Sequence, residues 1–373
     1  MVEAGQDNSF FIFDLQAVRD RVNMWRENLP DVGIFYSFKT NNDPELITTM
    51  LEMGANFDCA SKGEIKTAIA LGVKPENILY ANACKPHSHI AYAREAGVKI
   101  MTFDCVEEAE KIHSIYPEAE LILRITVDDR NAADPMSGKF GAKQQTWSPI
   151  LDTCKELKMR VRGVSFHVGS GGCSFSEYRD SIINAQTVFE MARKKGIPEM
   201  DILDIGGGFS MSSTDPEKNF DFVAPKINEM LKEYFPGENT NIKVIGEPGR
   251  FIAQDAMSVV VQIYLAKQLD DCRHYFVNNG IYHGFGCQIF ENLEFFKGQP
   301  LLPRAEYTQR IMKEERSFIF GQSCDGIDWL TKNRLFPYMH EGEWIIYRNF
   351  GAYGHVVATE FNGYEIPKIT YLN

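Results

Sequence analysis

The chain of 373 residues is 44% hydrophobic and 24% charged, a balance that is ordinary for a globular protein and excludes a disordered one. Its net charge of −12, from 39 basic and 51 acidic side chains, argues against a nucleic-acid partner and suits a cationic small molecule. The first eight residues lack a signal-peptide pattern, and no apolar run is long enough to span a bilayer. The eight cysteines form no Cys-x-x-Cys pair, so we expect reduced thiols in the cytoplasm and no metal site.

Eight short apolar, β-branched segments follow one another, with helical segments between them. They are residues 33–39, 55–59, 78–82, 99–104, 120–127, 160–169, 201–208 and 243–250. The connections carry helix signals: Asp43 precedes Pro44, Ser61 and Glu64 form a capping box, and Ser176 opens a long helix. This alternation predicts an α/β fold, a (β/α)8 barrel, with a doubly wound open sheet as the alternative.

After residue 250 the pattern changes to strands separated by turns. The expected strands are residues 256–265, 273–277, 316–320, 343–349 and 355–361. We therefore predict two domains: a barrel over residues 14–256, and an all-β sandwich or barrel over residues 257–373. Residues 1–13 contain a further strand, at 9–13, that is expected to join the sheet of the second domain.

Polar side chains end nearly every predicted barrel strand. In a (β/α)8 barrel the active site lies at these carboxyl ends, so the regularity predicts one site built from many strands. In chain order the strand-end residues are Lys39, Asp58, Asn82 with Lys85, Asp104, Arg124, His167, the glycines 206–208, and Glu247 with Arg250.

Three consecutive glycines, Gly206, Gly207 and Gly208, end the seventh strand. Without side chains their backbone amides can approach an anion, and the loops after strands seven and eight commonly bind phosphate in barrels. Arg250, on the neighbouring strand, can supply charge-assisted hydrogen bonds. We favour a phosphate site over a flexible turn.

Three single residues at the strand ends each allow a functional and a structural interpretation. Glu247 can keep the pyridine nitrogen of a pyridoxal cofactor protonated, or pair with Arg250. Lys39 can be a desolvated nucleophile held by Asp58, or an ordinary surface charge. His167 can stack on a cofactor ring, or be a satisfied core histidine.

The second domain carries Cys324-Asp325-Gly326 in a turn-rich stretch. From spacing alone this tripeptide is a buried cysteine beside a turn aspartate.

At these motifs the chain resembles the ornithine decarboxylases of eukaryotic type, which are fold-type III pyridoxal-phosphate enzymes. The resemblance covers nearly the whole chain. Its motifs are residues 35–39, 57–62, 80–85, 139–141, 165–171, 204–209, 247–250, 324–328, 351–353 and 361–363.

The resemblance implies pyridoxal 5'-phosphate as cofactor, bound covalently by Lys39, and a head-to-tail homodimer with active sites shared between subunits. Cofactor binding would involve Lys39, Asp58, Arg124, His167, Ser170, Gly207, Gly208, Glu247, Arg250 and Tyr353. Lys39, Glu247, His167 and Cys324 would be catalytic. Cys324 would arrive from the partner subunit and protonate the carbon left by carbon dioxide.

The resemblance also implies the substrate pocket and a subunit contact. Asp325, Glu291, Tyr353 and Phe361 would bind the substrate, with Asp325 at its distal amino group. Lys139 and Asp328 match a pair that bridges subunits in the family.

Two positions depart from the family's pattern. Asn278-Asn279-Gly280 replaces Asn-Asp-Gly, and Phe290-Glu291-Asn292 replaces Tyr-Asp-His. Glutamate at the second position also occurs in the short arginine decarboxylase of chlorella viruses, and a carboxylate pair can receive a guanidinium as readily as an ammonium. We expect L-ornithine as substrate, giving putrescine for polyamine biosynthesis, with L-arginine as the alternative.

Other relatives fit less well. Diaminopimelate decarboxylases follow the cysteine with glutamate, where Asp325 stands here, and alanine racemases lack the Cys-Asp-Gly element. A non-enzymatic alternative is a binding protein like the antizyme inhibitors, but Lys39, Asp58, Glu247 and Cys324 are all present. Antizyme binding cannot be predicted from the sequence.

Overall fold

The computed structural model describes residues 7–130, 136–170, 174–198, 200–211, 213, 215–236, 241–290, 298–302, 306, 309–310 and 313–372. The chain divides into two compact units. One is Arg19–Ile252, and the other combines Met1–Val18 with Ala253–Asn373. Of the helices in the part of the chain that the structure describes, none combines the length and the apolar character that crossing a bilayer requires.

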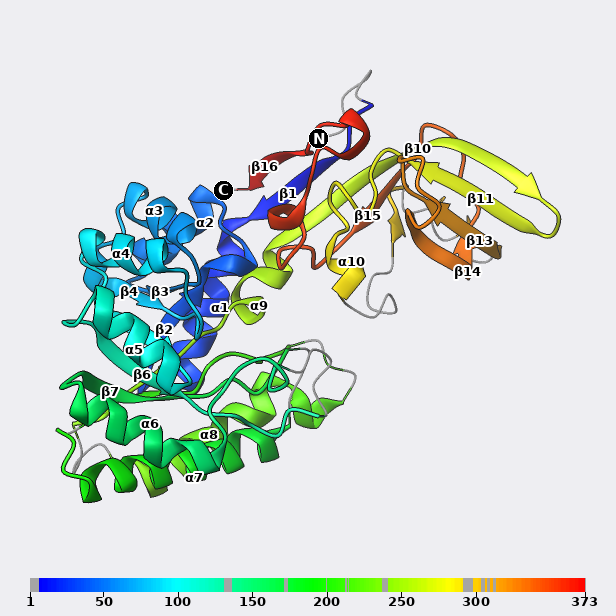
Figure 1. Cartoon of the computed structure of the whole chain (residues 1–373). Coiled ribbons are helices and arrows are strands. Elements are labelled where there is room, and N and C mark those ends of the chain that lie inside the picture. The colour runs from blue at the N-terminus through cyan, green and yellow to red at the C-terminus, as the bar shows by residue number, and fades with distance from the viewer. Residues whose placement is uncertain are drawn as a thin grey trace. The chain divides into compact units, whose positions relative to one another are not determined.

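The first unit contains eight parallel strands that close into a barrel in chain order (Figure 1). They are β2 (Val32–Ser37), β3 (Asn56–Cys59), β4 (Ile78–Tyr80), β5 (Ile100–Phe103), β6 (Glu120–Arg124), β7 (Arg160–Ser165), β8 (Ile202–Asp204) and β9 (Lys243–Gly246). Closure is made by β2, which pairs in parallel with β9. The predicted (β/α)8 barrel is confirmed, and the open sheet is wrong.

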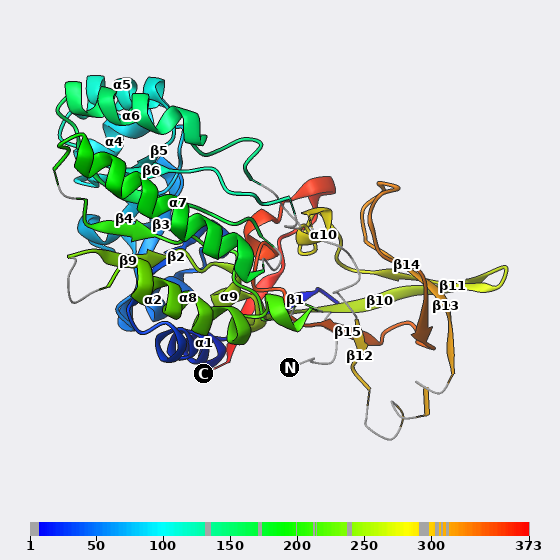
Figure 2. The same cartoon turned by 90° about the horizontal axis from the view of Figure 1, so that it is seen from below.

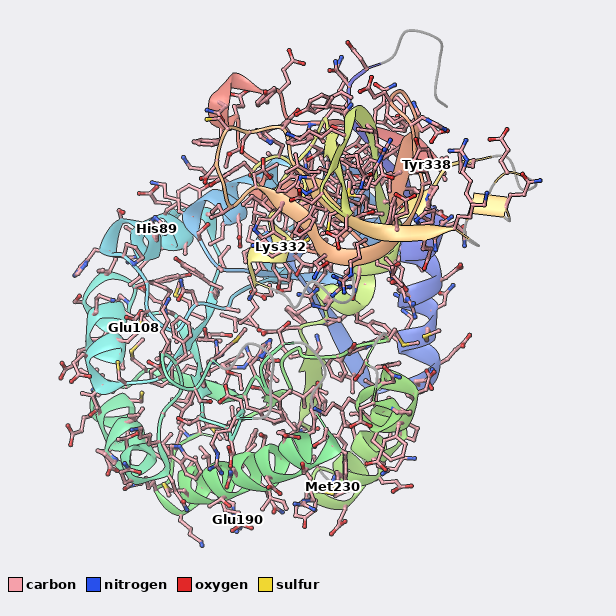
Figure 3. The ribbon with its side chains drawn as sticks, turned by 90° about the vertical axis from the view of Figure 1, so that its right-hand side faces the viewer. His89, Glu108, Glu190, Met230, Lys332 and Tyr338 are labelled. Atoms are coloured by element: carbon pink, nitrogen blue, oxygen red, sulfur yellow. The ribbon has the colours of Figure 1, made fainter. Side chains whose placement is uncertain are left out.

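Helices surround these strands, and Figure 3 shows them as a ring that carries His89, Glu108, Glu190 and Met230. They are α1 (Leu15–Asn28), α2 (Pro44–Glu52), α3 (Lys62–Ala70), α4 (His87–Ala96), α5 (Val106–Ile115), α6 (Gln144–Glu156), α7 (Phe175–Lys194), α8 (Phe220–Tyr234) and the short α9 (Arg250–Ala253). The 3-10 turns η1 (Phe38–Thr40), η2 (Pro75–Asn77), η3 (Pro216–Lys218) and η4 (Gln254–Ala256) complete the connections.

The predicted helix starts are largely confirmed. Asp43 caps α2 by accepting hydrogen bonds from the amides of Glu45 and Leu46. Ser61 caps α3 through the amide of Glu64. Helix α7 begins at Phe175, one residue before the predicted Ser176, and the side chain of the preceding Ser174 makes no capping hydrogen bond.

Apolar side chains fill the barrel, so it is a packed core and not a pore. Phe35, Leu79, Ile122 and Ile202 come from β2, β4, β6 and β8 and form one buried cluster with Ile245. Layers contributed by alternate strands are the usual filling of such barrels. Because this layer supports the strand ends, the polar residues that follow it are held on a rigid base.

The strand register brings the polar residues of neighbouring strands to the same level. Ser37 lies opposite Asp58 across β2 and β3. Arg124 lies opposite Ser165, which in turn lies opposite Asp204, across β6, β7 and β8. The strands end sooner than predicted, so Lys39, His167, the glycines and Glu247 lie in the loops just beyond them.

The second unit contains a mixed eight-stranded sheet (Figure 2). Its strands are β1 (Phe10–Asp14), β10 (Met257–Leu269), β11 (Cys272–Val277), β12 (Gln299–Pro300), β13 (Glu314–Phe320), β14 (Trp329–Pro337), β15 (Trp344–Tyr347) and β16 (Lys368–Leu372). The first half of the long β10 pairs with β1 and β15, and its second half pairs with β11 after a register shift at Ile263. The predicted strand at 9–13 therefore joins this sheet. The unit also contains the short helix α10 (Cys287–Phe290).

The strand predicted at residues 355–361 is wrong. This segment forms the 3-10 turns η6 (His355–Val357) and η7 (Phe361–Gly363). Its backbone groups bind other loops instead of a neighbouring strand: the Thr359 amide donates to the carbonyl of Tyr282 at 2.7 Å. Strands β14 and β16 were not predicted, because their side chains are largely polar or exposed and lack a clear apolar alternation.

Candidate active site

Lys39 lies in η1, directly after β2, where its ammonium meets a buried carboxylate. The Nζ of Lys39 lies 3.7 Å from Oδ2 of Asp58, whose side chain is only 1% exposed, whereas that of Lys39 is 39% exposed. Ser37 donates a hydrogen bond to the same Asp58 oxygen at 2.7 Å. Asp58 therefore holds a lysine whose side chain is partly exposed, so the desolvation expected from the sequence is only partial.

Asp58 has an unsatisfied oxygen. Burial raises the pKa of this carboxyl, and Lys39, the Ser37 hydroxyl and Arg124 oppose that rise. Its Oδ1 is buried and has no hydrogen-bond partner in the described chain. Because buried acceptors are normally paired, this oxygen is placed to receive a donor from a bound molecule.

His167 lies two residues beyond β7, and its ring is neutral. The amide of Gly169 donates to its Nδ1 at 3.1 Å, so the proton of the neutral imidazole is on Nε2. Burial lowers the pKa of His167 well below its ordinary value, and the cations Arg124 and Lys39 lower it further. A neutral, flat ring of this kind can stack on an aromatic cofactor.

The loop after β8 leaves no room for side chains. Gly206 and Gly208 have left-handed backbones, with φ of +64° and +96°. A Cβ on Gly207 would lie 2.9 Å from Nε2 of His167, and one on Gly208 would lie 2.6 Å from the carbonyl of Gly169. The Tyr178 hydroxyl fixes the loop by donating to the carbonyl of Gly207 at 2.9 Å. Backbone amides can therefore approach an anion here.

Ser170 and Arg250 belong to the loops on either side of this glycine loop. Ser170 follows β7, and Arg250 begins α9 after β9, while β8 pairs with both strands. The hydroxyl and the guanidinium thus flank the glycines in the strand order. This arrangement suits a phosphate group.

Glu247 and Asp204 form a pair of carboxyls at the ends of β9 and β8. Burial raises the pKa of Asp204 to about 7 and raises that of Glu247 well above its ordinary value. The negative charges of Asp204 and Asp58 raise the Glu247 pKa further. Oδ1 of Asp204 accepts from the amide of Gly206 at 2.9 Å. Its Oδ2 has no donor at hydrogen-bonding geometry in the described chain, although Glu247 approaches closely enough to lower the Asp204 pKa. Two such carboxyls favour sharing a proton.

Arg124 supplies positive charge at the end of β6. Its guanidinium lies 5.1 Å from the centre of the Phe140 ring, and its Nη2 lies 3.6 Å from the sulfur of Met136. Asp104 holds the same loop by accepting from the amide of Gly141 at 2.8 Å. The field of Arg124 favours the ionised form of Asp58 and the neutral form of His167.

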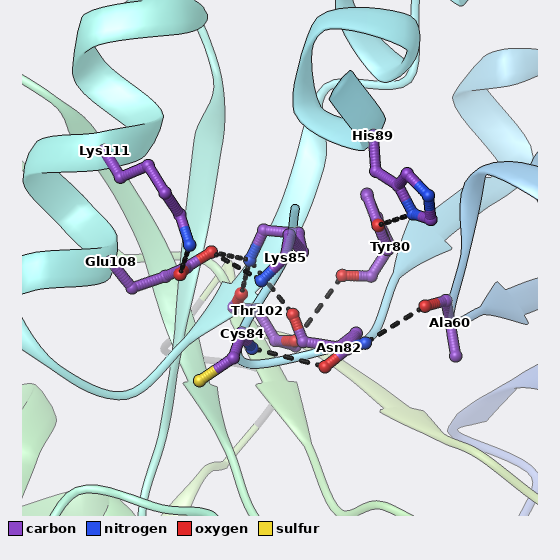
Figure 4. A network of polar contacts seen from close by, with 9 residues as sticks. All are labelled: Ala60, Tyr80, Asn82, Cys84, Lys85, His89, Thr102, Glu108 and Lys111. Atoms are coloured by element: carbon purple, nitrogen blue, oxygen red, sulfur yellow. Dashed lines mark hydrogen bonds and ion pairs between the residues drawn. The ribbon is translucent and has the colours of Figure 1, made fainter. Parts of the chain in front are cut away.

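Lys85, a strand-end residue in the sequence, has a structural role. Its side chain is fully buried and its Nζ lies 2.9 Å from Oε1 of Glu108 and donates to the carbonyls of Asn82 and Thr102 (Figure 4). Lys111 pairs with the other Glu108 oxygen. The network ties the loop after β4 to β5 and α5.

Glu108→Gln is expected to destabilise the protein by about 3–5 kcal/mol, because it leaves the buried Lys85 cation without its counter-charge. The exposed Glu110 lies on the same helix and provides the matched control. Glu110→Gln is expected to change stability by no more than about 0.5 kcal/mol. Equal melting temperatures for the two variants in thermal unfolding would show that the buried pair is not important for stability.

The second unit holds a separate group of predicted site residues. Cys324 is exposed, and Asp325 beside it accepts a hydrogen bond from the Tyr282 hydroxyl at 2.5 Å and one from the amide of Ile327 at 3.1 Å. The Tyr282 bond, and then the amide bond, hold the pKa of Asp325 below its ordinary value. The ring of Tyr282 lies 4.3 Å from that of Phe361. The structure thus brings Cys324, Asp325 and Phe361 into one cluster.

The remaining predicted residues lie as follows. Tyr353 has a left-handed backbone, with φ of +56°. Asp328 is 2% exposed, and its two oxygens accept from the amides of Ile281 and Ser323, each at 2.9 Å. Lys139 is exposed, and its pairing with Asp328 of another subunit stays a prediction. Glu291 lies outside the described residues.

Two residues of the site escaped sequence reasoning. Asp204 belongs to a motif of the resemblance, but nothing in the pattern indicated that its side chain meets Glu247. Tyr282 comes shortly after Asn278-Asn279-Gly280, and only the folded loop brings it to Asp325. No spacing rule would have found either contact.

Comparisons with known proteins agree with this geometry. Residues 15–254 match the family described as pyridoxal-dependent decarboxylase, pyridoxal binding domain. The ornithine decarboxylase of Caenorhabditis elegans is 38% identical over 98% of this chain and 87% of its own, and that of Rattus norvegicus is 36% identical over 98% and 80%. The solved arginine decarboxylase of Paramecium bursaria Chlorella virus has a TM-score of 0.91 and 35% identity, covering 99% of this chain and 97% of its own.

A barrel whose first strand leads to a lysine, and whose seventh leads to a glycine loop, is the framework of a pyridoxal-phosphate lyase. With the agreement above over most of its length, the chain belongs to the pyridoxal-dependent decarboxylase family.

The residues present fit pyridoxal phosphate as the cofactor. The loop of residues 206–208, in which neighbouring atoms exclude side chains, suits the phosphate because its backbone amides can donate to an anion. The neutral ring of His167 suits the face of the pyridine ring, and the carboxyl of Glu247 suits its nitrogen. Lys39 is the amine available for covalent attachment.

Proposed function

We propose that this protein decarboxylates L-ornithine to putrescine and carbon dioxide, in polyamine biosynthesis. The identity to curated ornithine decarboxylases over nearly the full length supports this substrate. The observation that carries the proposal is the ionised Asp325, held by Tyr282 and the amide of Ile327. A fixed carboxylate of this kind can bind the distal ammonium of a basic amino acid.

Bound pyridoxal phosphate supplies an electron-withdrawing ring that accepts charge from the substrate's α-carbon. The chain's own residues organise the reaction around it. Lys39 supplies the attaching amine and Asp58 orients it. Glu247 holds a proton at the pyridine nitrogen, His167 covers the ring face, and Cys324 donates a proton to the carbon that has lost carbon dioxide.

Asp325→Asn removes the charge and keeps one acceptor oxygen for the amide of Ile327, while its NH2 group can donate to the Tyr282 hydroxyl in place of the second oxygen. We expect kcat/KM for L-ornithine to fall about 30-fold or more, because the distal ammonium loses its counter-charge. L-Norvaline, which lacks that ammonium, serves as the control substrate, and its slow turnover should be unaffected. An unchanged kcat/KM for ornithine in steady-state kinetics would refute the role of Asp325.

L-Arginine is the second candidate substrate. The observation that favours it is the similarity to the chlorella-virus arginine decarboxylase, with TM-scores of 0.91 and 0.92 and 97% coverage of that chain. Product analysis with ornithine, arginine and lysine offered separately distinguishes agmatine from putrescine. If more agmatine than putrescine forms, arginine is the preferred substrate.

We further propose that the protein is a cytoplasmic homodimer with composite active sites, in which Cys324 and Asp325 serve the barrel of the partner. The exposed apolar side chains around this cysteine support an interface: Ile327 is 59% exposed, and Phe361 and Tyr364 are each 40% exposed. The proposal extends to the Lys139–Asp328 bridge, to the domain limits 14–256 and 257–373, and to Tyr353 as a phosphate ligand. By resemblance to the family, the proposal also extends to antizyme as a partner.

Mixing two inactive homodimers tests the composite site. When Lys39→Ala and Cys324→Ala subunits exchange, each hybrid dimer carries both lesions in one site and has one intact site. Random pairing makes about half of the dimers hybrid, so roughly a quarter of all sites should recover. Differently tagged chains verify the exchange. If exchange is complete and activity stays at the level of the single variants, each site lies within one subunit.

An antizyme-inhibitor-like protein without cofactor is the non-enzymatic alternative. Absorbance of bound pyridoxal phosphate in the visible range distinguishes the two, since such a binding protein would be colourless. The match to a pyridoxal-binding family supports the enzyme.

A further inference from the structure

The thiol of Cys324 has a direct hydrogen-bond partner, Asn362. The Sγ of Cys324 donates to Oδ1 of Asn362 at 3.5 Å, and the backbone amide of Cys324 donates to the same oxygen at 3.3 Å. One carboxamide oxygen therefore holds both the main chain and the side chain of the cysteine. Among the residues that the structure describes, no other side chain forms a hydrogen bond with this sulfur.

The backbone of Asn362 is adapted to this task. Its φ of +57° and ψ of 15° are left-handed, a conformation that asparagine tolerates better than most residues. The turn that presents it is fixed on both sides. His283 donates from Nε2 to the carbonyl of Phe361 at 2.9 Å, and the Tyr364 hydroxyl donates to the carbonyl of Gln322 at 3.0 Å.

The loop that carries the cysteine is fixed independently. Asp328 is buried and accepts from the amide of Ser323 at 2.9 Å. Both loops are therefore also held by contacts that do not involve the Asn362 carboxamide. The carboxamide adds a bond to the Cys324 amide and, through its bond to the thiol, fixes the orientation of the Cys324 side chain.

We propose that Asn362 is a positioning residue that holds the Cys324 thiol, with its proton, in one orientation for proton transfer. This inference rests on the proposed role of Cys324 and adds the group that orients it. In the transfer the proton leaves sulfur for the substrate carbon, a C–H bond forms, and the S–H electron pair remains on sulfur as a thiolate. The S–H contact with Asn362 breaks in the same step.

The test uses the cofactor-loaded protein and the variant Asn362→Gly, since glycine adopts the left-handed backbone without strain and removes only the carboxamide. Iodoacetamide alkylation is followed by mass spectrometry of the Cys324 peptide, with the exposed Cys84 in the same protein as reference. We expect the Cys324-to-Cys84 alkylation ratio to rise at least about threefold, because the thiol released from the Asn362 oxygen can turn toward the reagent. We expect kcat to fall about tenfold with KM changed less than about twofold, since only the proton transfer is disturbed.

Asn349→Gly is the matched control, because Asn349 is exposed, lies in the same unit and has a φ of +65°. It should behave as the parent in both measurements. Asn362→Asp keeps an acceptor oxygen and is expected to restore kcat to within about threefold and to lower the alkylation ratio.

An unchanged alkylation ratio overturns the proposal, and so does a raised ratio with unchanged kcat. A fall in kcat without a change in the ratio also overturns it, because the loss would then arise elsewhere. Cys324→Ala examines the proposed function separately. Full activity in that variant would remove Cys324 from the reaction, while the ratio in Asn362→Gly would still report whether the contact exists.

Discussion

Lys39→Ala is expected to abolish decarboxylation and covalent attachment of the cofactor. Lys39 is the amine at the end of β2, held 3.7 Å from Asp58, whereas Lys85, at the end of β4, is fully buried and committed to Glu108. No second lysine among the described strand ends of the barrel can therefore take over. The measurements are turnover of L-ornithine, and the mass of the protein after borohydride reduction in the presence of pyridoxal phosphate.

Lys62→Ala is the control for this experiment. Lys62 begins α3, and its ammonium lies 5.1 Å from the centre of the Tyr92 ring. That variant should keep both activity and the mass increase. If Lys39→Ala gained the same mass and turned over substrate at the parent rate, Lys39 would not be the attaching residue.

Glu247→Gln is expected to lower kcat by about 100-fold or more, which corresponds to about 2.7 kcal/mol or more of transition-state stabilisation. The amide keeps the shape of the side chain but cannot take a negative charge beside the pyridine nitrogen. Burial raises the pKa of Glu247, so the ionised form of this carboxyl needs a neighbouring cation to stabilise it. In the absence of such a cation the carboxyl favours its protonated form, in company with Asp204.

Glu177→Gln offers the same chemical change at another buried glutamate. Glu177 lies on α7 and meets the hydroxyls of Ser174 and Ser176, so its variant should keep kcat within about threefold. Cofactor affinity, measured by fluorescence titration, should fall much less than kcat in Glu247→Gln, since the phosphate contacts persist. A kcat loss of threefold or less in Glu247→Gln would make Glu247 a structural residue.

The pattern of the sequence was sufficient to predict the barrel. Eight β-branched segments alternating with capped helices admit few other architectures, and the polar residues that end those segments must meet at one end of a parallel barrel. For this reason Lys39, Asp58, His167, the glycines and Glu247 could be assigned to one site from their positions alone. The short connections Asp43-Pro44 and Ser61–Glu64 were readable because capping is a local interaction between residues two or three positions apart.

Contacts between distant loops were decided only by the tertiary structure. The loop at 282–283 and the turn at 361–363 are brought together by hydrogen bonds across about eighty positions of sequence, so no periodicity encodes them. The hydrogen bond between Cys324 and Asn362 likewise joins two loops that are separated along the sequence. Residues 355–361 make their contacts with such distant loops, and they therefore form turns instead of the expected strand.

Protonation states were likewise settled by burial. The sequence contains Asp204, Glu247 and His167 as ordinary titratable residues. Burial raises the pKa values of the two acids, although the charge of Arg124 opposes that rise in both and the charge of Lys39 opposes it in Glu247. Burial lowers the pKa of the histidine, and the charges of Arg124 and Lys39 lower it further. Local sequence therefore determined which residues reach the end of the barrel, and long-range packing determined what each can do there, because desolvation depends on neighbours that lie far apart along the chain.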